Sequence, residues 1–478
     1  MSKRRKNYFI PSENRVYGSK YKPRHSITTF QAALRATIIV GQAFSLIPFV
    51  VVLCMSKRRK NYFIPSENKV HVSKYKPRHS ITTFQAALRA TIIVGQAFSL
   101  IPFVSVFTND AENVKFVRTS WKCVYSLMSL VGQMFMTVLC INKLAKTTVS
   151  LNGTSPVIFY TTTCVTMMMF YQVARRWPEL VQHISKAEEI DPNYDCSLAR
   201  KCNITCGIVL FLALLEHILS LLSAFASAAV CYANLDTYEG FVKHFYPWVF
   251  NFIPYSMILG LVTQFLHFQS TFIWNFSDLF IICMSYYLTS RMKQVNKKLL
   301  AAQGKYLPEV FWKTTREDYC RATQIVRKVD DVINGVVFIS FANNLFFICL
   351  QLFNTLEDGL KGTGECSSKT GPLGGHEAAT YFLFSLVYLL SRSVAVSLIA
   401  SQVNSASSVP APVLYDVPSP VYCVEVQRFL DQVNGDKVAL SGLQFFSVTR
   451  GLLLTVSFVL TPFNDILNTF ISWSQSFC

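Results

Sequence analysis

Apolar residues gather in seven long runs that contain few charges. The runs are residues 121–145, 157–174, 206–230, 250–288, 335–353, 380–400 and 451–463. A bilayer core of about 30 Å needs about 20 helical residues, so each of the first six runs is long enough to cross a membrane. Barrel strands would alternate apolar and polar residues, and these runs do not alternate. The pattern predicts an all-α polytopic membrane protein, a bundle of seven transmembrane helices.

Composition agrees with this interpretation, and the positions of the basic residues orient the bundle. The chain is 51% hydrophobic and 15% charged, with a net charge of +18. Basic clusters follow alternate runs, at residues 175–176 and 291–298, and another lies at residues 3–6. Such clusters stay in the cytoplasm. We therefore expect a plasma-membrane protein with a cytoplasmic N-terminus, inverted relative to a G-protein-coupled receptor, with membrane lipid and not nucleic acid as its partner.

The N-terminal part contains a near-perfect repeat. Residues 1–50 recur as residues 55–104 with only three differences. An exon duplication or a gene-assembly error explains so exact a copy better than a solenoid does, because a solenoid needs several diverged repeats. The apolar part of each copy contains an arginine, Arg35 or Arg89, which is costly inside a span but tolerated at the interface. We expect an interfacial or re-entrant helix there.

The predicted spans carry polar and aromatic side chains, and an unpartnered polar group in a membrane is costly. The candidates for ligand contact are Glu216, His217, Tyr255, Gln264, Trp274, Asn343, Asn344, Gln351, Tyr381 and Tyr388. The same spans also carry His267, Gln269, Asn275, Asp278 and Arg392. Hydrogen bonding between helices explains any single one of them. As a set they suit a cavity for a sugar, whose hydroxyls need hydrogen bonds and whose C–H faces stack on aromatic rings.

Motifs for catalysis are absent from the sequence. It has no His-Glu-x-x-His, no Gly-x-Ser-x-Gly, no phosphate-binding Gly-rich loop and no paired CxxC. We expect no enzyme activity, no cofactor and no metal. In the predicted topology Cys231 and Cys366 lie outside, where a disulfide between them is one option, and the sequon at Asn152 is a candidate for glycosylation.

Several segments resemble the insect gustatory receptors, and within them the sugar-receptor branch. They are FIWNFSDLF at 272–280, ARRWP at 174–178, LEH at 215–217, and the block CVEVQRF, VALSG and FFSVTR between 423 and 450. The resemblance covers about residues 80–460. It implies the seven-helix insect chemoreceptor fold and a tetrameric cation channel, homomeric or heteromeric, gated by sugar in taste neurons. The ligand would bind among helices in the outer half of the membrane.

The resemblance also implies that helix 7 of four subunits lines the pore and that the cytoplasmic helices before it form the tetramer anchor. The anchor and pore candidates are Val438, Ser441, Phe445, Thr449, Arg450 and Thr461. Gustatory receptors usually end helix 7 with a Thr-Tyr … Gln-Phe signature, whereas Thr461 is followed here by Pro462. We therefore expect this chain, expressed alone, to give no sugar-evoked current.

These inferences divide the chain into five parts. They are a duplicated segment (1–54), a cytoplasmic N-terminus with the interfacial or re-entrant helix (55–116), helices 1–6 with the ligand cavity (117–403), a cytoplasmic anchor (404–450) and helix 7 (451–478). The alternative is a transporter or a membrane enzyme. A transporter more often shows paired half-repeats, which are not seen after residue 105. A membrane enzyme needs a clustered constellation of histidines or carboxylates, to which only Glu216 and His217 point.

Overall fold

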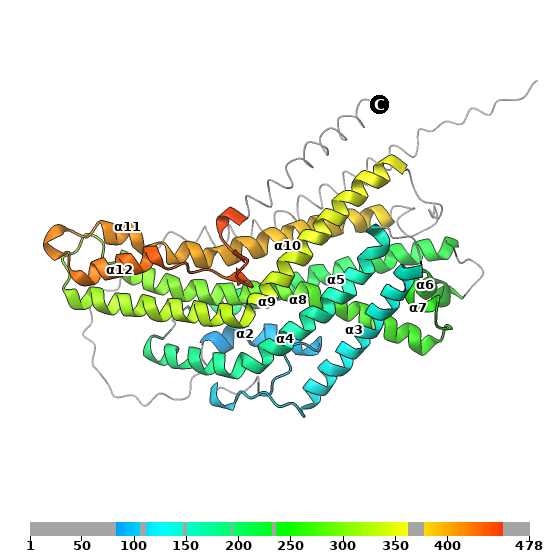
Figure 1. Cartoon of the computed structure of the whole chain (residues 1–478), viewed down its shortest axis with the longest axis horizontal. Helices are drawn as coiled ribbons and strands as arrows, with labels where there is room; N and C mark the ends of the chain where they lie inside the picture. The colour runs from blue at the N-terminus through cyan, green and yellow to red at the C-terminus, as the bar shows by residue number, and fades with distance from the viewer. Residues whose placement is uncertain are drawn as a thin grey trace, which may run out of the picture.

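Six long helices run side by side in the computed structural model (Figure 1). They are α3 (Trp121–Lys146), α4 (Leu151–Ile190), α5 (Leu198–Cys231), α8 (Met257–Leu300), α9 (Glu309–Lys361) and α10 (Glu377–Ser407). The structure describes residues 83–105, 111–146, 151–192, 195–231, 236–361 and 377–452. The duplicated segment and nearly all of the predicted helix 7 lie outside these residues, so both stay predictions.

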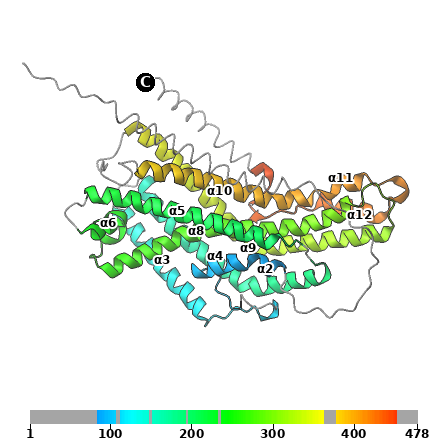
Figure 2. The ribbon, with the colours of Figure 1, turned by 180° about the vertical axis from the view of Figure 1, so that it is seen from behind.

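Shorter elements complete the described chain. They are α2 (Thr83–Ala97), η1 (Ala111–Asn113), α6 (Thr237–Phe245), α7 (Pro247–Phe250), α11 (Pro410–Tyr415), η2 (Ser419–Val421), α12 (Val424–Gly435), β1 (Ser441–Gly442) and β2 (Phe446–Ser447). Helices α6 and α7 lie at one end and α11 and α12 at the other (Figures 1 and 2). We call these the α6–α7 end and the α11–α12 end.

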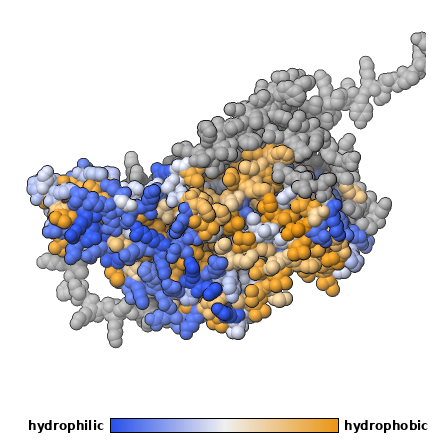
Figure 3. All heavy atoms as spheres, in the orientation of Figure 1, coloured by the Kyte–Doolittle hydropathy of each residue, from blue (hydrophilic) through white to orange (hydrophobic). Residues whose placement is uncertain are grey.

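The surface has the character of a membrane protein. Apolar residues cover much of the side of the bundle, and hydrophilic residues gather toward the α11–α12 end (Figure 3). Within the described residues, five helices are long and apolar enough to cross a membrane: α3, α4, α5, α9 and the helix that begins at Glu377. Helix α8 is also long, but most of it is buried among the other helices. A helix shielded from lipid by protein does not need an apolar surface.

The start of the fourth predicted span is wrong by several residues. The apolar run begins at residue 250, whereas α8 begins at Met257, where the Ser256 hydroxyl accepts a hydrogen bond from the Leu259 amide at 3.2 Å. Residues before that point belong to α7 and a turn. They are apolar because they pack against the buried side chains of Tyr246 and Val249 at the α6–α7 end, and not because they cross lipid.

Helix α2 is inserted among α4, α5 and α8. Its buried face includes Phe84, Leu88 and Ile92. At its N-terminus the Glu188 carboxylate of α4 accepts hydrogen bonds from the amides of Thr83 (2.8 Å) and Phe84 (3.3 Å). A carboxylate stabilises this end of a helix because it pairs with free N–H groups and with the positive end of the helix dipole.

The chain turns back after α2. Ser99 and Ile101 have positive φ angles of 62° and 51°. The Gln96 side chain stabilises this turn by donating hydrogen bonds to the carbonyls of Ile101 (3.2 Å) and Phe103 (2.9 Å). The chain thus enters the bundle as α2 and turns back after it. The membrane depth of α2 stays a prediction.

Close packing of α2 on α8 gives a first test. A Cβ at Gly95 would lie 2.6 Å from Cζ of Phe276, whose side chain is fully buried. Overpacking of this kind costs about 1–3 kcal/mol, so Gly95→Ala is expected to lower the thermal unfolding temperature of the purified chain. The matched control is Gly207→Ala in α5, where a Cβ meets nothing within 4 Å. Because alanine is favoured over glycine in a helix, the control should be unchanged or more stable. Equal effects of the two changes would contradict this packing.

Candidate ligand site

A buried ion pair joins α8 to α10. Asp278 of α8 is 0% exposed and Arg392 of α10 is 3% exposed, and Nε of the arginine lies 2.7 Å from Oδ2 of the aspartate. Helix α9 completes the aspartate's partners. The Ser340 hydroxyl donates to Oδ1, and the Asn344 amide donates to both oxygens at 3.0 and 3.2 Å. The carboxylate therefore has partners from α9 and α10.

The rest of the Arg392 guanidinium contacts aromatic and amide side chains. One terminal nitrogen donates to Oδ1 of Asn275, and the other donates to Oδ1 of Asn344 at 3.2 Å. Cζ lies 4.5 Å from the ring centroid of Trp274 and 5.4 Å from that of Tyr388. Both distances are within the range of cation–π attraction.

The two aromatic rings are also fixed by hydrogen bonds of their own. Trp274 Nε1 donates to Oδ1 of Asn344 at 3.3 Å, and the Tyr388 hydroxyl donates to Oδ1 of Asn275 at 2.8 Å. Each asparagine oxygen thus accepts from one aromatic group and from Arg392. Five side chains, counting Asp278, surround one guanidinium and form a polar core in the bundle. We call Trp274, Asn275, Asn344 and Tyr388, together with Asp278 and Arg392, the polar core.

A second carboxylate lies beside this core. Glu216 of α5 is buried and accepts a hydrogen bond from the Ser385 hydroxyl of α10 at 2.6 Å. The Gln351 amide of α9 donates to the same hydroxyl at 2.9 Å. Tyr381 lies one helical turn before Ser385 on α10. Three helices therefore bring a carboxylate, a hydroxyl and an amide together.

A cage of aromatic and imidazole rings is built around His267. The rings of His217 and His267 have centroids 5.8 Å apart, and the ring of Tyr246 lies 5.6 Å from that of His267. The Tyr160 hydroxyl is 3.0 Å from Nδ1 of His267, and Trp248 packs edge-on against Tyr160 at 6.0 Å. This cage connects the polar side chains of α5 and α8 with α7 at the α6–α7 end.

Three sequence candidates lie away from the polar core. The Gln264 side chain accepts a hydrogen bond from the Tyr238 hydroxyl at 3.2 Å. The Tyr255 ring packs against Phe250 at 6.0 Å, close to the start of α8. Asn343 is buried but does not share the hydrogen bonds described for Asn344. Of the remaining seven candidates, Trp274, Asn344 and Tyr388 belong to the core, Glu216, Gln351 and Tyr381 group around Ser385, and His217 packs against His267.

Ser385, Ser340, Tyr160 and Trp248 were not predicted from the sequence. Serine hydroxyls are common on helices and carry no pattern of their own. Tyr160 lies in an apolar run and Trp248 in a segment that was not assigned to a helix. Nothing in the periodicity of either region signals a contact with His267.

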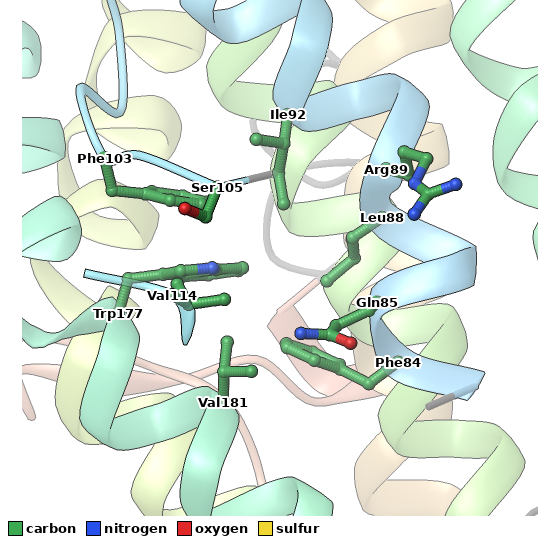
Figure 4. Close-up of a pocket in the computed structure, with 10 residues that line it drawn as sticks. All are labelled: Phe84, Gln85, Leu88, Arg89, Ile92, Phe103, Ser105, Val114, Trp177 and Val181. Atoms are coloured by element: carbon green, nitrogen blue, oxygen red, sulfur yellow. The ribbon is translucent and has the colours of Figure 1, made fainter. Parts of the chain in front are cut away.

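A pocket lies between α2 and α4 (Figure 4). It is lined by Phe84, Gln85, Leu88, Arg89, Ile92, Phe103, Ser105, Val114, Trp177 and Val181. Phe103 and Trp177 stack there with their centroids 5.7 Å apart. The walls are mainly apolar, so this pocket has fewer converging polar groups than a sugar requires. It shares no residue with the predicted ligand set.

Most of the predicted anchor and pore residues follow α12 in the chain, close to the last described residue. Ser441 donates from its amide (2.6 Å) and its hydroxyl (2.8 Å) to the carboxylate of Asp330 in α9. The Val438 side chain is buried, Phe445 is exposed, and Arg450 is exposed at the last described turn. Thr449 immediately precedes that turn, and Thr461 lies outside the described residues.

Helix α12 is tied to α9 by charge. The Arg316 guanidinium donates to the Glu425 carboxylate at 2.8 Å and lowers the pKa of that carboxyl group.

Close packing explains the glycine of the VALSG motif. A Cβ at Gly442 would overlap the ring of Phe446 in the paired strand β2, and the intervening Leu443 and Gln444 have positive φ angles.

Two predictions for the outer side of the membrane, a disulfide and a glycosylation site, fall partly outside the described residues. Cys231 is disulfide-bonded, but its predicted partner Cys366 lies outside the described residues, so the pairing stays a prediction. The side chain of Asn152 is also outside the described part. Among the residues that the structure describes, no group of three or more His, Cys, Asp or Glu residues is arranged to hold a metal ion.

Comparison with solved structures identifies the fold. The structure is similar to that of the olfactory receptor OR5 from Machilis hrabei, solved with eugenol (TM-score 0.56) and without it (TM-score 0.55). In both comparisons the identity is 14%, and the match covers 80% of this chain and 97% of the receptor. The fold is therefore that of the insect chemoreceptors, as the sequence predicted.

The sequence comparisons identify the family. The family model for trehalose receptors matches residues 66–476, so the chain belongs to the trehalose receptor family. Gustatory receptor 5a for trehalose from Drosophila melanogaster is 30% identical over 393 residues, which is 81% of this chain and 85% of that receptor. Gustatory receptor for sugar taste 64f from the same species is also 30% identical over 393 residues, 81% of each chain. The resemblance to the sugar branch is confirmed, and the family is one of receptors and not of enzymes.

Proposed function

We propose that this chain is a sugar-detecting subunit of a ligand-gated cation channel in the plasma membrane of taste neurons. The names of its relatives support trehalose or another sugar as the ligand. The observation that carries the proposal is the group formed by Glu216, Ser385 and Gln351 beside the aromatic rings of the polar core. A buried carboxylate and amide suit hydroxyl groups, and the neighbouring rings suit the C–H faces of a sugar.

The proposed orientation places the N-terminus and the α11–α12 end in the cytoplasm. Basic residues support it, since Lys297 and Lys298 lie in the last turn of α8, near that end of the bundle. In this orientation the His267 cage faces the outside, and a sugar would enter from the α6–α7 end. The polar core would then be the floor of the ligand site.

The proposed assembly is a tetramer, homomeric or heteromeric with other gustatory receptor subunits. The exposed Phe445 and the anchor that includes Val438 and Ser441 support an interface where the β1–β2 hairpin packs on the middle of α9. Helix 7 of each subunit would line the pore. Because the sequence departs from the usual ending after Thr461, we expect this chain to need a second subunit for sugar-evoked current.

Substitution of Glu216 tests the proposal. Hydrogen bonds to charged groups contribute about 1.5–3 kcal/mol, so Glu216→Ala is expected to raise the half-maximal trehalose concentration about tenfold or more. The measurement is the dose–response of cells that express the chain with other sugar-receptor subunits, normalised to surface-labelled receptor.

The matched control is Glu179→Ala, which removes a carboxylate whose side chain is 71% exposed on α4 and pairs with Lys328. Its dose–response should equal that of the wild type. If Glu216→Ala reaches the surface and also keeps the wild-type dose–response to trehalose and sucrose, Glu216 is a helix-packing residue and the proposed site is wrong.

A further inference from the structure

Each nitrogen of the Arg392 guanidinium faces a different side chain. Nε faces Asp278, one terminal nitrogen donates to Asn275 and the other donates to Asn344. Its Cζ lies 4.5 Å from the centroid of the Trp274 ring. An arginine in a membrane-spanning helix is costly, and such residues are normally found where they have a function. The partners of Arg392 indicate what its function is.

The contacts of Arg392 determine how its neighbours point. The Asn344 amide has its oxygen toward Arg392 and Trp274 and its nitrogen toward Asp278. A flip of this amide would set its N–H groups against the guanidinium, so only one orientation satisfies all four side chains. That orientation in turn fixes the acceptor for the Trp274 indole.

The Tyr388 ring is oriented in a similar way, through Asn275. The Tyr388 hydroxyl donates to the Asn275 oxygen that also accepts from Arg392. Lysine cannot replace this arrangement, because an ammonium group lacks the planar fork that serves several acceptors at fixed angles and the flat face that stacks on a ring. The geometry depends on the guanidinium itself and not only on its charge.

We propose that Arg392 is the positioning residue of the ligand site, which aligns Trp274 and Tyr388 for stacking against the sugar without itself contacting the sugar. This inference rests on the proposed function and names the residue that sets the site's geometry. It predicts that loss of the guanidinium fork weakens sugar affinity while receptors at the cell surface still open at saturating sugar.

The chain contains a close control for this proposal. Arg291 of α8 is 2% exposed and forms an ion pair with Asp191, with Nη2 3.2 Å from Oδ2. It also donates to the Asp191 backbone carbonyl at 2.6 Å. None of these contacts involves the polar core. Arg291→Lys therefore imposes the same chemical change at a similarly buried ion pair outside the ligand site.

The experiment compares Arg392→Lys with Arg291→Lys in the full chain. The first readout is the trehalose dose–response, separated into half-maximal concentration and maximal response per surface receptor. We expect Arg392→Lys to raise the half-maximal concentration at least tenfold and to keep the maximal response. Arg291→Lys should keep a half-maximal concentration within about twofold of the wild type, because its contacts lie outside the polar core. A tenfold change in affinity corresponds to about 1.4 kcal/mol.

The second readout does not need a ligand. The fluorescence of Trp274, obtained as the difference between purified protein with and without Trp274→Phe, should shift in Arg392→Lys and not in Arg291→Lys. A receptor that gives no sugar response but shows this shift would defeat the proposed function and leave the positioning role in place. Wild-type affinity together with unchanged Trp274 emission in Arg392→Lys would overturn the positioning role. Equal losses of surface receptor in both variants, with unchanged affinity, would also overturn it.

Discussion

Replacing Trp177 with alanine is expected to lower the free energy of unfolding by about 3–5 kcal/mol. Trp177 of α4 is only 1% exposed. Its ring stacks on Phe103 at 5.7 Å and lies 5.6 Å from Phe84 and 6.0 Å from Phe280. The side chain therefore connects α4 with α2, with the segment that follows α2, and with α8. Its removal leaves a cavity that rings held by three elements cannot fill.

The measurement is the fraction of purified, detergent-solubilised chain that stays monodisperse after heating through a temperature series. Trp121→Ala is the matched control, because Trp121 is 71% exposed at the start of α3 and its loss opens no internal cavity. The control should melt within a few degrees of the wild type. If both variants melt together, α2 does not pack on α4 as described here.

Hydropathy predicted the positions of the long helices but not how far they extend. The run 121–145 agrees closely with α3 (Trp121–Lys146), whereas the run 335–353 is only part of α9 (Glu309–Lys361). Lipid demands apolar residues only over its own thickness, and beyond it a helix is free to be polar. The first half of α9 therefore gave no signal in the hydropathy pattern.

The candidate site shows the same limit at the level of side chains. The sequence indicated that Trp274, Asn344 and Tyr388 are unusual in a span, but not that Arg392 holds them together. Neighbours on a helix point about 100° apart, so Asn343 and Asn344 are equivalent in sequence and different in space. Which one faces a partner depends on the rotation of α9 against α8 and α10, and that is set by packing across the whole bundle.

The largest single-residue effect in the polar core is expected for Asp278→Ala. The change removes the carboxylate that forms an ion pair with Arg392 and leaves the buried guanidinium without its nearest counter-charge. Loss of one partner of a buried ion pair costs about 3–5 kcal/mol, so little of this variant should reach the cell surface. Surface labelling relative to total protein measures it. Glu179→Ala is the control, since the Glu179 side chain is 71% exposed and its pair with Lys328 should contribute about 1 kcal/mol or less.

A second change separates the stability of the ion pair from its role in the site. Asp278→Leu combined with Arg392→Met replaces both charges by apolar groups of similar size, and such replacements are often neutral or stabilising. The double variant should therefore recover most of the surface receptor that Asp278→Ala loses. It should not recover trehalose affinity, because methionine supplies neither the fork that orients Asn344 nor the flat cation beside Trp274. A double variant with wild-type affinity would show that the pair serves stability alone, and one that stays as poorly expressed as Asp278→Ala would show that unpaired charge is not the cause of the loss.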